Sequence, residues 1–174
     1  LYDRETELAN GSFHAAVRVS AHPWPGHEEV ALFGEAVFPV ATPSLATAHD
    51  LDSESAAADV LAAPLLHMDS TDRPWMSWAD WLDRFDLQLT PNRRSVELDR
   101  YPSVLQQVML GRGGALGWAG ILDELLDGKA LVVVGPTIRT DRQYTVTWPS
   151  RRPSSAVEAT VEWLAQTSAA GSDQ

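Results

Sequence analysis

Residues 64–85 read PLLHMDSTDRPWMSWADWLDRF and carry the signals of both a strand and a helix. The apolar run from Leu65 to Met68 follows Pro64 and has the length of a buried strand. Pro74 suits a helix start, because proline is tolerated in a first helical turn. Beyond it, apolar residues recur at the spacing of one helix face, namely Trp78, Trp81, Leu82 and Phe85. The stretch therefore predicts a strand followed by a helix.

The rest of the chain extends this alternation. Upstream, alternation with a period of two predicts a strand over residues 13–19, and richness in valine and phenylalanine predicts a second strand over residues 30–41. Downstream, we expect helices at 53–63, 102–109, 121–126 and from Ser155, and strands at 96–98, 130–134 and 144–148. Ala115 and Leu116 fall in a glycine-rich bend. Because parallel neighbours need a crossover helix, this order predicts an α/β fold whose strands are mostly parallel.

The composition is that of one ordinary globular domain. The chain has 174 residues, 44% of them hydrophobic and 21% charged, which excludes a largely disordered protein. No apolar run approaches the ~20 residues of a transmembrane helix, and the absence of cysteine excludes disulfides and thiolate sites. A formal charge of −11, from 13 basic and 24 acidic residues, makes phosphate backbones and anionic membranes poor direct partners.

The glycine-rich segment 111–117, GRGGALG, is the most suggestive local motif. A dinucleotide-binding loop needs glycine at its first, third and sixth positions and follows a strand. Here Leu116 occupies the sixth position and a predicted helix precedes the segment. We therefore interpret the segment as a helix C-cap and a tight bend rather than as a cofactor site.

The histidines, and the absence of a nucleophile motif, decide whether the chain could bind a metal or catalyse a reaction. His22 and His27 lie in a proline-rich loop, where solvated side chains are a simpler interpretation than metal ligands. His67 ends a predicted buried strand, so two interpretations stay open: a satisfied buried histidine, or a ligand contact at the carboxyl end of the strand. No G-x-S-x-G elbow occurs. We expect no catalytic residue, no metal and no cofactor.

Short motifs along the whole chain follow a familiar order. They are WPG at 24–26, LFGE at 32–35, FPVATPSLA at 38–46, LLH at 65–67, WADWL at 78–82, LQQ at 105–107, GRGGALG at 111–117, GKALV at 128–132, YTV at 144–146 and VEWL at 161–164. In this order they resemble the effector domain of LysR-type transcriptional regulators, in the branch of the glycine-cleavage activator and the β-lactamase regulator. His14 and Gly114 depart from the family pattern, which often has aspartate and valine there.

The resemblance implies a fold of two Rossmann-like α/β subdomains, as in type 2 periplasmic binding proteins, joined by two crossing hinge strands. Subdomain I would comprise residues 1–40 plus 143–174, and subdomain II residues 41–142. The family's effector region normally opens with a strand, a helix and a second strand that would precede Leu1. We therefore expect subdomain I to be incomplete at its N-terminus, with those first strands either deleted or disordered.

The resemblance also implies a function. A small metabolite would bind in the cleft between the subdomains and shift their relative arrangement. The regulator would be a cytoplasmic homodimer or homotetramer and would contact DNA only through an N-terminal helix-turn-helix absent from this chain. It would be neither an enzyme nor a membrane protein. The alternative is a periplasmic-type solute-binding protein, which would carry a secretion leader upstream.

Candidate effector contacts come from strand ends and helix starts, where clefts of α/β proteins form. The predicted effector-binding residues are His67, Met68, Asp69, Asp99, Tyr101, Ser103, Gly117, Trp118 and, from the resemblance, Tyr144. A carboxylate on the effector would suit the helix start near Ser103, because free N–H groups and the helix dipole favour anions there.

Overall fold

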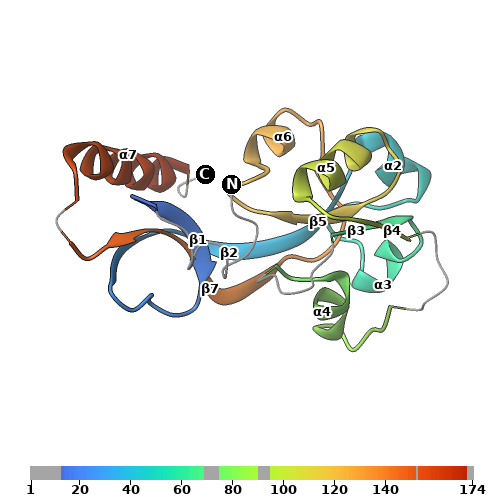
Figure 1. Ribbon diagram of the computed structural model, residues 1–174. Coiled ribbons are helices and arrows are strands. Elements are labelled where there is room, and N and C mark those ends of the chain that lie inside the picture. Colours follow the sequence, from blue (N-terminus) through green and yellow to red (C-terminus); the bar gives the residue numbers. More distant parts are fainter. Residues whose placement is uncertain (1–12, 69–74, 90–94, 152, 172–174) are drawn as a thin grey trace. The chain divides into compact units, whose positions relative to one another are not determined.

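The computed structural model describes residues 13–68, 75–89, 95–151 and 153–171. Its contacts divide the chain into two compact units (Figure 1). Unit 1 comprises Leu1–Glu35 and Arg139–Gln174, and unit 2 comprises Ala36–Ile138. Two long strands, β2 (His27–Ala41) and β7 (Ile138–Pro149), each contain a boundary between the units. The chain thus passes from one unit to the other within strands.

Unit 1 is built from strands and one long helix. Strand β1 (Ala16–Ser20) pairs antiparallel with β7, with Val19 opposite Tyr144, and β7 neighbours β2. Helix α7 (Ser155–Gly171) follows, and its Val157 is buried. The predicted strands near 13–19 and 144–148 and the last helix are confirmed. Helix α7 begins at Ser155 as predicted, and the Ser154 hydroxyl accepts the Val157 N–H at 3.4 Å.

A buried carboxylate lies between β2 and β7 within unit 1. Glu35 is 2% exposed, yet its carboxylate accepts hydrogen bonds from the Thr140 hydroxyl at 2.7 Å and the Arg142 guanidinium at 3.1 Å. Because an unpaired buried charge is costly, these partners are what allow a glutamate at this position.

Unit 2 alternates short helices and strands, as an α/β protein does. Its elements after β2 are α2 (Pro43–Ala48), α3 (Ala57–Val60), β3 (Leu65–Met68), α4 (Trp78–Asp83), β4 (Ser95–Leu98), α5 (Tyr101–Met109), β5 (Ala115–Trp118), α6 (Asp123–Asp127) and β6 (Val132–Val133). Strands β3 and β4 are parallel neighbours, and helices α5 and α4 lie on opposite sides of them (Figure 1).

Most helices and strands of unit 2 lie where the sequence predicts them, with shorter bounds. Helix α4 begins after Ser77, whose hydroxyl accepts the Asp80 N–H, and Pro74 lies outside the described residues. Helix α5 carries Pro102 in its first turn, and Gly111 follows it with a φ of 69°. The helix predicted over 53–63 is reduced to α3.

The prediction of mostly parallel strands is wrong for the main sheet. Among the described residues, β2 pairs antiparallel with both β5 and β6, and β1 pairs antiparallel with β7. The predicted bend at Ala115 and Leu116 is also wrong, because these residues begin strand β5. The neighbouring glycines permit close packing: a Cβ on Gly113 would lie 2.8 Å from the Pro64 carbonyl oxygen.

One apolar cluster joins β2, β3, α5 and β5 into the core of unit 2. Its buried members are Phe38, Val40, Leu66, Val104, Val108, Ala115, Leu122 and Leu131. Met68 and Tyr101 are partly buried and pack against this cluster from its edge. The core therefore fixes the positions of side chains that also face a cavity.

Candidate functional site

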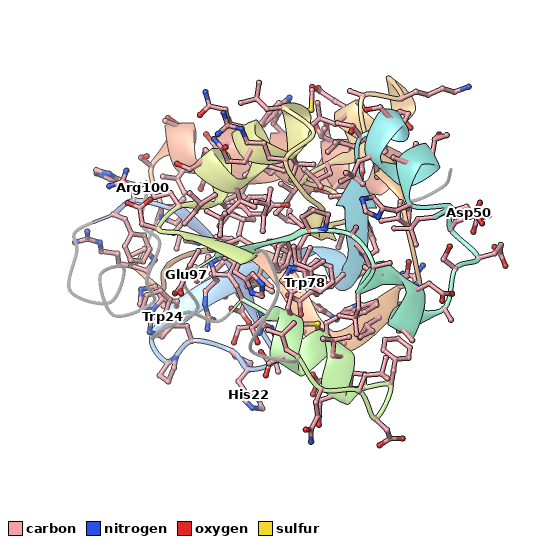
Figure 2. All side chains as sticks on the ribbon, turned by 90° about the vertical axis from the view of Figure 1, so that its right-hand side faces the viewer. His22, Trp24, Asp50, Trp78, Glu97 and Arg100 are labelled. Atoms are coloured by element: carbon pink, nitrogen blue, oxygen red, sulfur yellow. The ribbon has the colours of Figure 1, made fainter. Side chains whose placement is uncertain are left out.

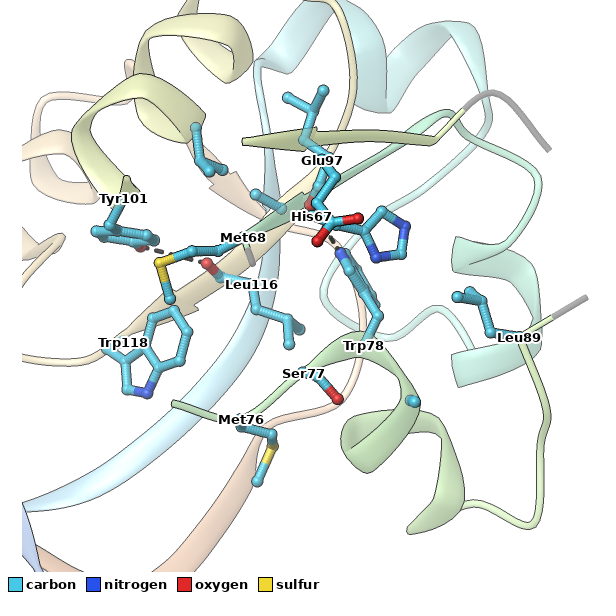
Figure 3. A pocket seen from close by; sticks show the side chains of 14 residues that line it. His67, Met68, Met76, Ser77, Trp78, Leu89, Glu97, Tyr101, Leu116 and Trp118 are labelled. Atoms are coloured by element: carbon cyan, nitrogen blue, oxygen red, sulfur yellow. Dashed lines mark hydrogen bonds between the residues drawn. The ribbon is translucent and has the colours of Figure 1, made fainter. Parts of the chain in front are cut away.

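A cavity of about 250 Å³ lies within unit 2, between β3, β4, β5, helix α4 and the start of helix α5 (Figure 3). Four residues predicted from the sequence line it, namely His67, Met68, Tyr101 and Trp118. Ten lining residues were not predicted as contacts: Leu66, Met76, Ser77, Trp78, Ala79, Leu89, Glu97, Val104, Ala115 and Leu116. The structure thus brings residues from five helices and strands, and Met76, Ser77 and Leu89 outside them, to one place.

An aromatic corner forms one end of the cavity. Tyr101 and Trp118 pack edge to face with ring centroids 5.3 Å apart, and Trp75 stacks on Tyr101 at 6.0 Å. The Tyr101 hydroxyl donates a hydrogen bond to the Leu116 carbonyl at 3.2 Å, which ties α5 to β5. Figure 3 shows Tyr101, Met68 and Trp118 together at this end. The corner is a rigid, largely apolar surface.

Trp78 anchors the wall that α4 provides. The side chain extends from α4 toward β3, and its indole N–H donates to the Leu66 carbonyl at 3.0 Å (Figures 2 and 3). Ser77 caps the helix and donates its hydroxyl hydrogen to the Asp80 carboxylate at 2.6 Å. Both polar groups therefore already have hydrogen-bond partners within the wall.

His67 and Glu97 form the polar end of the cavity. They occupy paired positions on the parallel strands β3 and β4, and Figure 3 shows the Glu97 side chain reaching toward the His67 ring. The His67 Nε2 atom is buried and has no hydrogen-bond partner among the described residues. Burial lowers the pKa of His67, and the negative charge of Glu97 opposes this shift. The imidazole is accordingly neutral at pH 7.

Among the described residues that line the cavity, one carries a formal charge, namely Glu97, and none is a lysine or an arginine. Glu97 itself is exposed at the rim and makes no ion pair among the described residues. The site therefore combines an acidic end with an aromatic end.

Among the other predicted contacts of unit 2, Asp99, Ser103 and Gly117 do not line the cavity. Asp99 is exposed in the turn after β4, and Asp69 lies outside the described residues. Ser103 is in the first turn of α5, where its N–H donates to the Arg100 carbonyl at 3.1 Å. Gly117 is buried in β5, and a Cβ there would lie 2.6 Å from the Leu122 side chain, on the core side.

Tyr144 belongs to unit 1, on β7. It is buried, stacks on Phe33 with centroids 4.7 Å apart, and its hydroxyl has no hydrogen-bond partner among the described residues. Burial raises the pKa of Tyr144, the nearby Glu35 carboxylate raises it further, and Arg142 opposes both effects. Tyr144 thus remains a protonated phenol, and its O–H has no acceptor among the described residues.

Sequence reasoning missed Glu97 and Trp78, and the reasons differ. Glu97 lies in a strand too short to show which of its faces is covered. Its position opposite His67 follows once β3 and β4 are paired in parallel register, and that pairing was the available signal. Trp78 belongs to the apolar helix face that the sequence predicts and is buried at 3% exposure, but the same side chain also forms the cavity wall.

Metal and membrane sites find no support in the described part of the chain. No group of three or more metal-ligating side chains forms there. Within the described ranges, no helix combines the length and the apolar character needed to span a bilayer.

The structure of this chain is similar to solved structures of known proteins. The chain aligns with the effector domain of the transcriptional regulator AmpR of Pseudomonas aeruginosa at 24% identity, with a TM-score of 0.71, over 97% of this chain and 79% of that one. The AmpR effector binding domain from Citrobacter freundii gives 22% identity and a TM-score of 0.71, over 96% of this chain and 80% of that one. The regulatory domain of CrgA from Neisseria meningitidis gives 11% identity and 0.59, over 88% and 74%.

A search of curated proteins finds no significant match. The structural neighbours confirm the predicted type 2 periplasmic-binding-protein-like α/β fold. The family model described as "LysR substrate binding domain" matches residues 3–169, which is almost the whole chain. The chain belongs to the LysR substrate binding domain family.

Proposed function

We propose that this chain senses a small-molecule effector for a LysR-type transcriptional regulator, and that the cavity of unit 2 is part of its effector site. Family membership supports the regulatory role over that of a periplasmic solute-binding protein. One observation supports the site: four residues chosen from the sequence, His67, Met68, Tyr101 and Trp118, line the same cavity. Cavities of this mixed apolar and polar kind are where small ligands usually bind.

The proposed task is binding rather than turnover. The structural neighbours are effector and regulatory domains of transcriptional regulators, not enzymes. For binding to be a signal, the effector must have a higher affinity for one conformation of the domain than for another. The chain itself then needs only a site whose occupancy shifts the equilibrium between these two conformations.

The partners of the whole protein are also proposals. The net charge of −11 disfavours direct DNA contact by this domain, so a separate helix-turn-helix segment would bind DNA. A homodimer or homotetramer would carry the signal between domains, and such a regulator would act in the cytoplasm. Membership of the glycine-cleavage-activator branch is proposed on the sequence motifs alone.

Several predicted features stay predictions. These are the effector cleft between subdomains, the subdomain limits of 1–40 with 143–174 and 41–142, and contacts by Asp69, Asp99, Ser103, Gly117 and Tyr144. The hydroxyl of Tyr144 is buried and has no partner among the residues that the structure describes, which supports its candidacy, because such a donor gains a hydrogen bond when a ligand reaches it.

A ligand screen followed by a blocking substitution tests the cavity. Thermal shift with amino acids, small acids, amines and cell-wall fragments identifies ligands that raise the melting temperature of the chain. We expect Met68→Trp, which fills the cavity, to lower the affinity of a hit by tenfold or more. Met109→Trp is the matched control, because Met109 is 45% exposed on α5 and does not line the cavity. A hit that binds the Met68→Trp variant as tightly as the wild type would exclude the cavity as its site.

A further inference from the structure

The polar groups left over in the cavity indicate what it can bind. Most polar groups of the walls are already used: the Tyr101 hydroxyl donates to Leu116, the Trp78 N–H donates to Leu66, and the Ser77 hydroxyl bonds Asp80. Among the described lining side chains, what remains is the Glu97 carboxylate and the Nε2 of His67, which has no hydrogen-bond partner among these residues. Both lie at one end of the cavity (Figure 3).

Both of these groups act as hydrogen-bond acceptors. An ionised carboxylate only accepts, and a neutral imidazole presents one nitrogen with a free lone pair. Because burial keeps His67 neutral, its Nε2 atom accepts when the proton is on Nδ1. A ligand group that donates several hydrogen bonds and carries a positive charge would satisfy both, and an ammonium has three donors and no acceptor.

The opposite end of the cavity is matched to an apolar body. Met68, Tyr101 and Trp118 present a thioether and two aromatic rings there (Figure 3). The volume of about 250 Å³ would hold roughly eight waters at ~30 Å³ each, which suits a single ring with a short chain. Burying that ring against the aromatic corner releases water and stabilises the complex.

We propose that the cavity of unit 2 takes a small organic cation, an amine joined through a short chain to an apolar group, with its ammonium between Glu97 and His67 and its apolar group against Tyr101 and Trp118. This inference rests on the proposed function and names the chemical class of its ligand. It differs from the carboxylate predicted at the start of α5. Pro102 has no N–H and the Ser103 N–H is already bonded, so that helix start offers few free donors.

Three probes of nearly equal shape test the inference: 2-phenylethylamine, 3-phenylpropionate and 2-phenylethanol. Tryptophan fluorescence reports binding, because Trp78 and Trp118 line the cavity, and calorimetry gives the affinities. We expect the amine to bind at least fivefold more tightly than the acid or the alcohol. Equal or weaker binding of the amine, or no binding of any probe, would overturn the inference.

Substitution of Glu97 identifies the charge responsible. Glu97→Gln keeps the shape of an exposed side chain, so the fold should tolerate it, and it should lower amine affinity about fivefold while leaving the alcohol unchanged. Glu124→Gln is the matched control, since Glu124 is exposed on α6 and does not line the cavity. Loss of the amine preference in both variants would mean that net charge, not Glu97, attracts the probe, and would refute the inference.

Failure of the ligand class and failure of the site give different results. If the acid or alcohol binds best and Met68→Trp abolishes that binding, the cavity is a site but not for a cation. If no probe binds and effector hits are insensitive to Met68→Trp, the proposed site itself is wrong.

Discussion

Trp78 and Trp81 pack edge to face with ring centroids 5.6 Å apart, yet their indole N–H groups have different environments. The Trp78 N–H donates to the Leu66 carbonyl at 3.0 Å. The Trp81 N–H is buried and has no partner among the described residues. Both side chains are almost fully buried on the same short helix, so the pair isolates the contribution of one hydrogen bond.

Replacing each tryptophan by phenylalanine should separate that contribution. Both variants lose similar ring area, but only Trp78→Phe leaves a buried carbonyl without its donor. We expect Trp78→Phe to cost about 1 kcal/mol more than Trp81→Phe in the free energy of unfolding. Urea denaturation measures both values. Equal costs would mean that the bond to Leu66 contributes nothing net.

The stability of the chain should depend on His67 at mildly acidic pH. Its folded-state pKa lies below the reference value of 6.5, so the unfolded chain binds the proton more readily. The stabilisation is therefore complete above pH 6.5 and is lost as the pH falls toward the folded-state pKa. We expect melting temperatures of the wild type to fall faster than those of His67→Gln between pH 7 and 5. His22→Gln, at an exposed loop position, should follow the wild type. Parallel curves for wild type and His67→Gln would contradict the shift.

The ion pair of Glu35 and Arg142 should stabilise unit 1. The Glu35 side chain is 1% exposed and that of Arg142 is 24% exposed, so Arg142→Leu leaves a buried carboxylate without its ion pair. We expect a loss of about 2–3 kcal/mol, recovered in large part by adding Glu35→Gln. Arg139→Leu, at an exposed position on the same strand, should change stability by less than about 0.5 kcal/mol. Chemical denaturation of the wild type and these three variants tests the pair. If the double variant is no more stable than Arg142→Leu, the ion pair contributes nothing to stability.

Gly117 gives a test that distinguishes packing from ligand contact. An added Cβ would lie 2.6 Å from the Leu122 side chain and 3.1 Å from that of Val40, in a filled core. We expect Gly117→Ala to cost about 1–3 kcal/mol. Gly34→Ala on β2 meets nothing within 4 Å and should be neutral or slightly stabilising. If Gly117→Ala is as stable as the wild type but binds effector more weakly, Gly117 acts as a contact instead.

Tyr144→Phe removes a buried hydroxyl that makes no hydrogen bond among the described residues. Deleting such a group removes a desolvation cost, so we expect unfolding free energy to stay constant or to rise by up to about 1 kcal/mol. If Tyr144 contacts the effector, affinity for a screened hit should fall in the same variant. Calorimetry with that hit decides the second point, and unchanged affinity would remove Tyr144 from the candidate contacts.

The sequence predicted the elements whose signals are local. Strand β3 matches its predicted bounds because Pro64 and four consecutive residues, LLHM, mark it. Helix α5 was predicted because Pro102 and Gly111 mark its two ends. Strand β5 was missed because its glycines suggest a bend, whereas Gly113 and Gly117 serve close packing against Pro64 and Leu122. Only the tertiary contact distinguishes those two roles.

The sequence rule for the candidate site selects only residues at the ends of strands and the starts of helices. His67, Met68, Tyr101 and Trp118 satisfy that rule, and they line the cavity. Trp78 is the first residue of α4, but the sequence indicates a helix start at Pro74, so this rule did not select Trp78. Side-chain periodicity identifies a buried face but not whether the space beside it is filled.

The order of the elements around the cavity has a consequence for how it responds to a ligand. Strand β3, helix α4 and strand β4 follow one another along the chain, so the helix that walls the cavity is also the crossover that lets the two strands run parallel. A molecule in the cavity would touch all three parts of this single β–α–β motif. Occupancy would then oppose the local opening of that motif. The concentration of a metabolite would in this way be converted into the stability of one supersecondary structure.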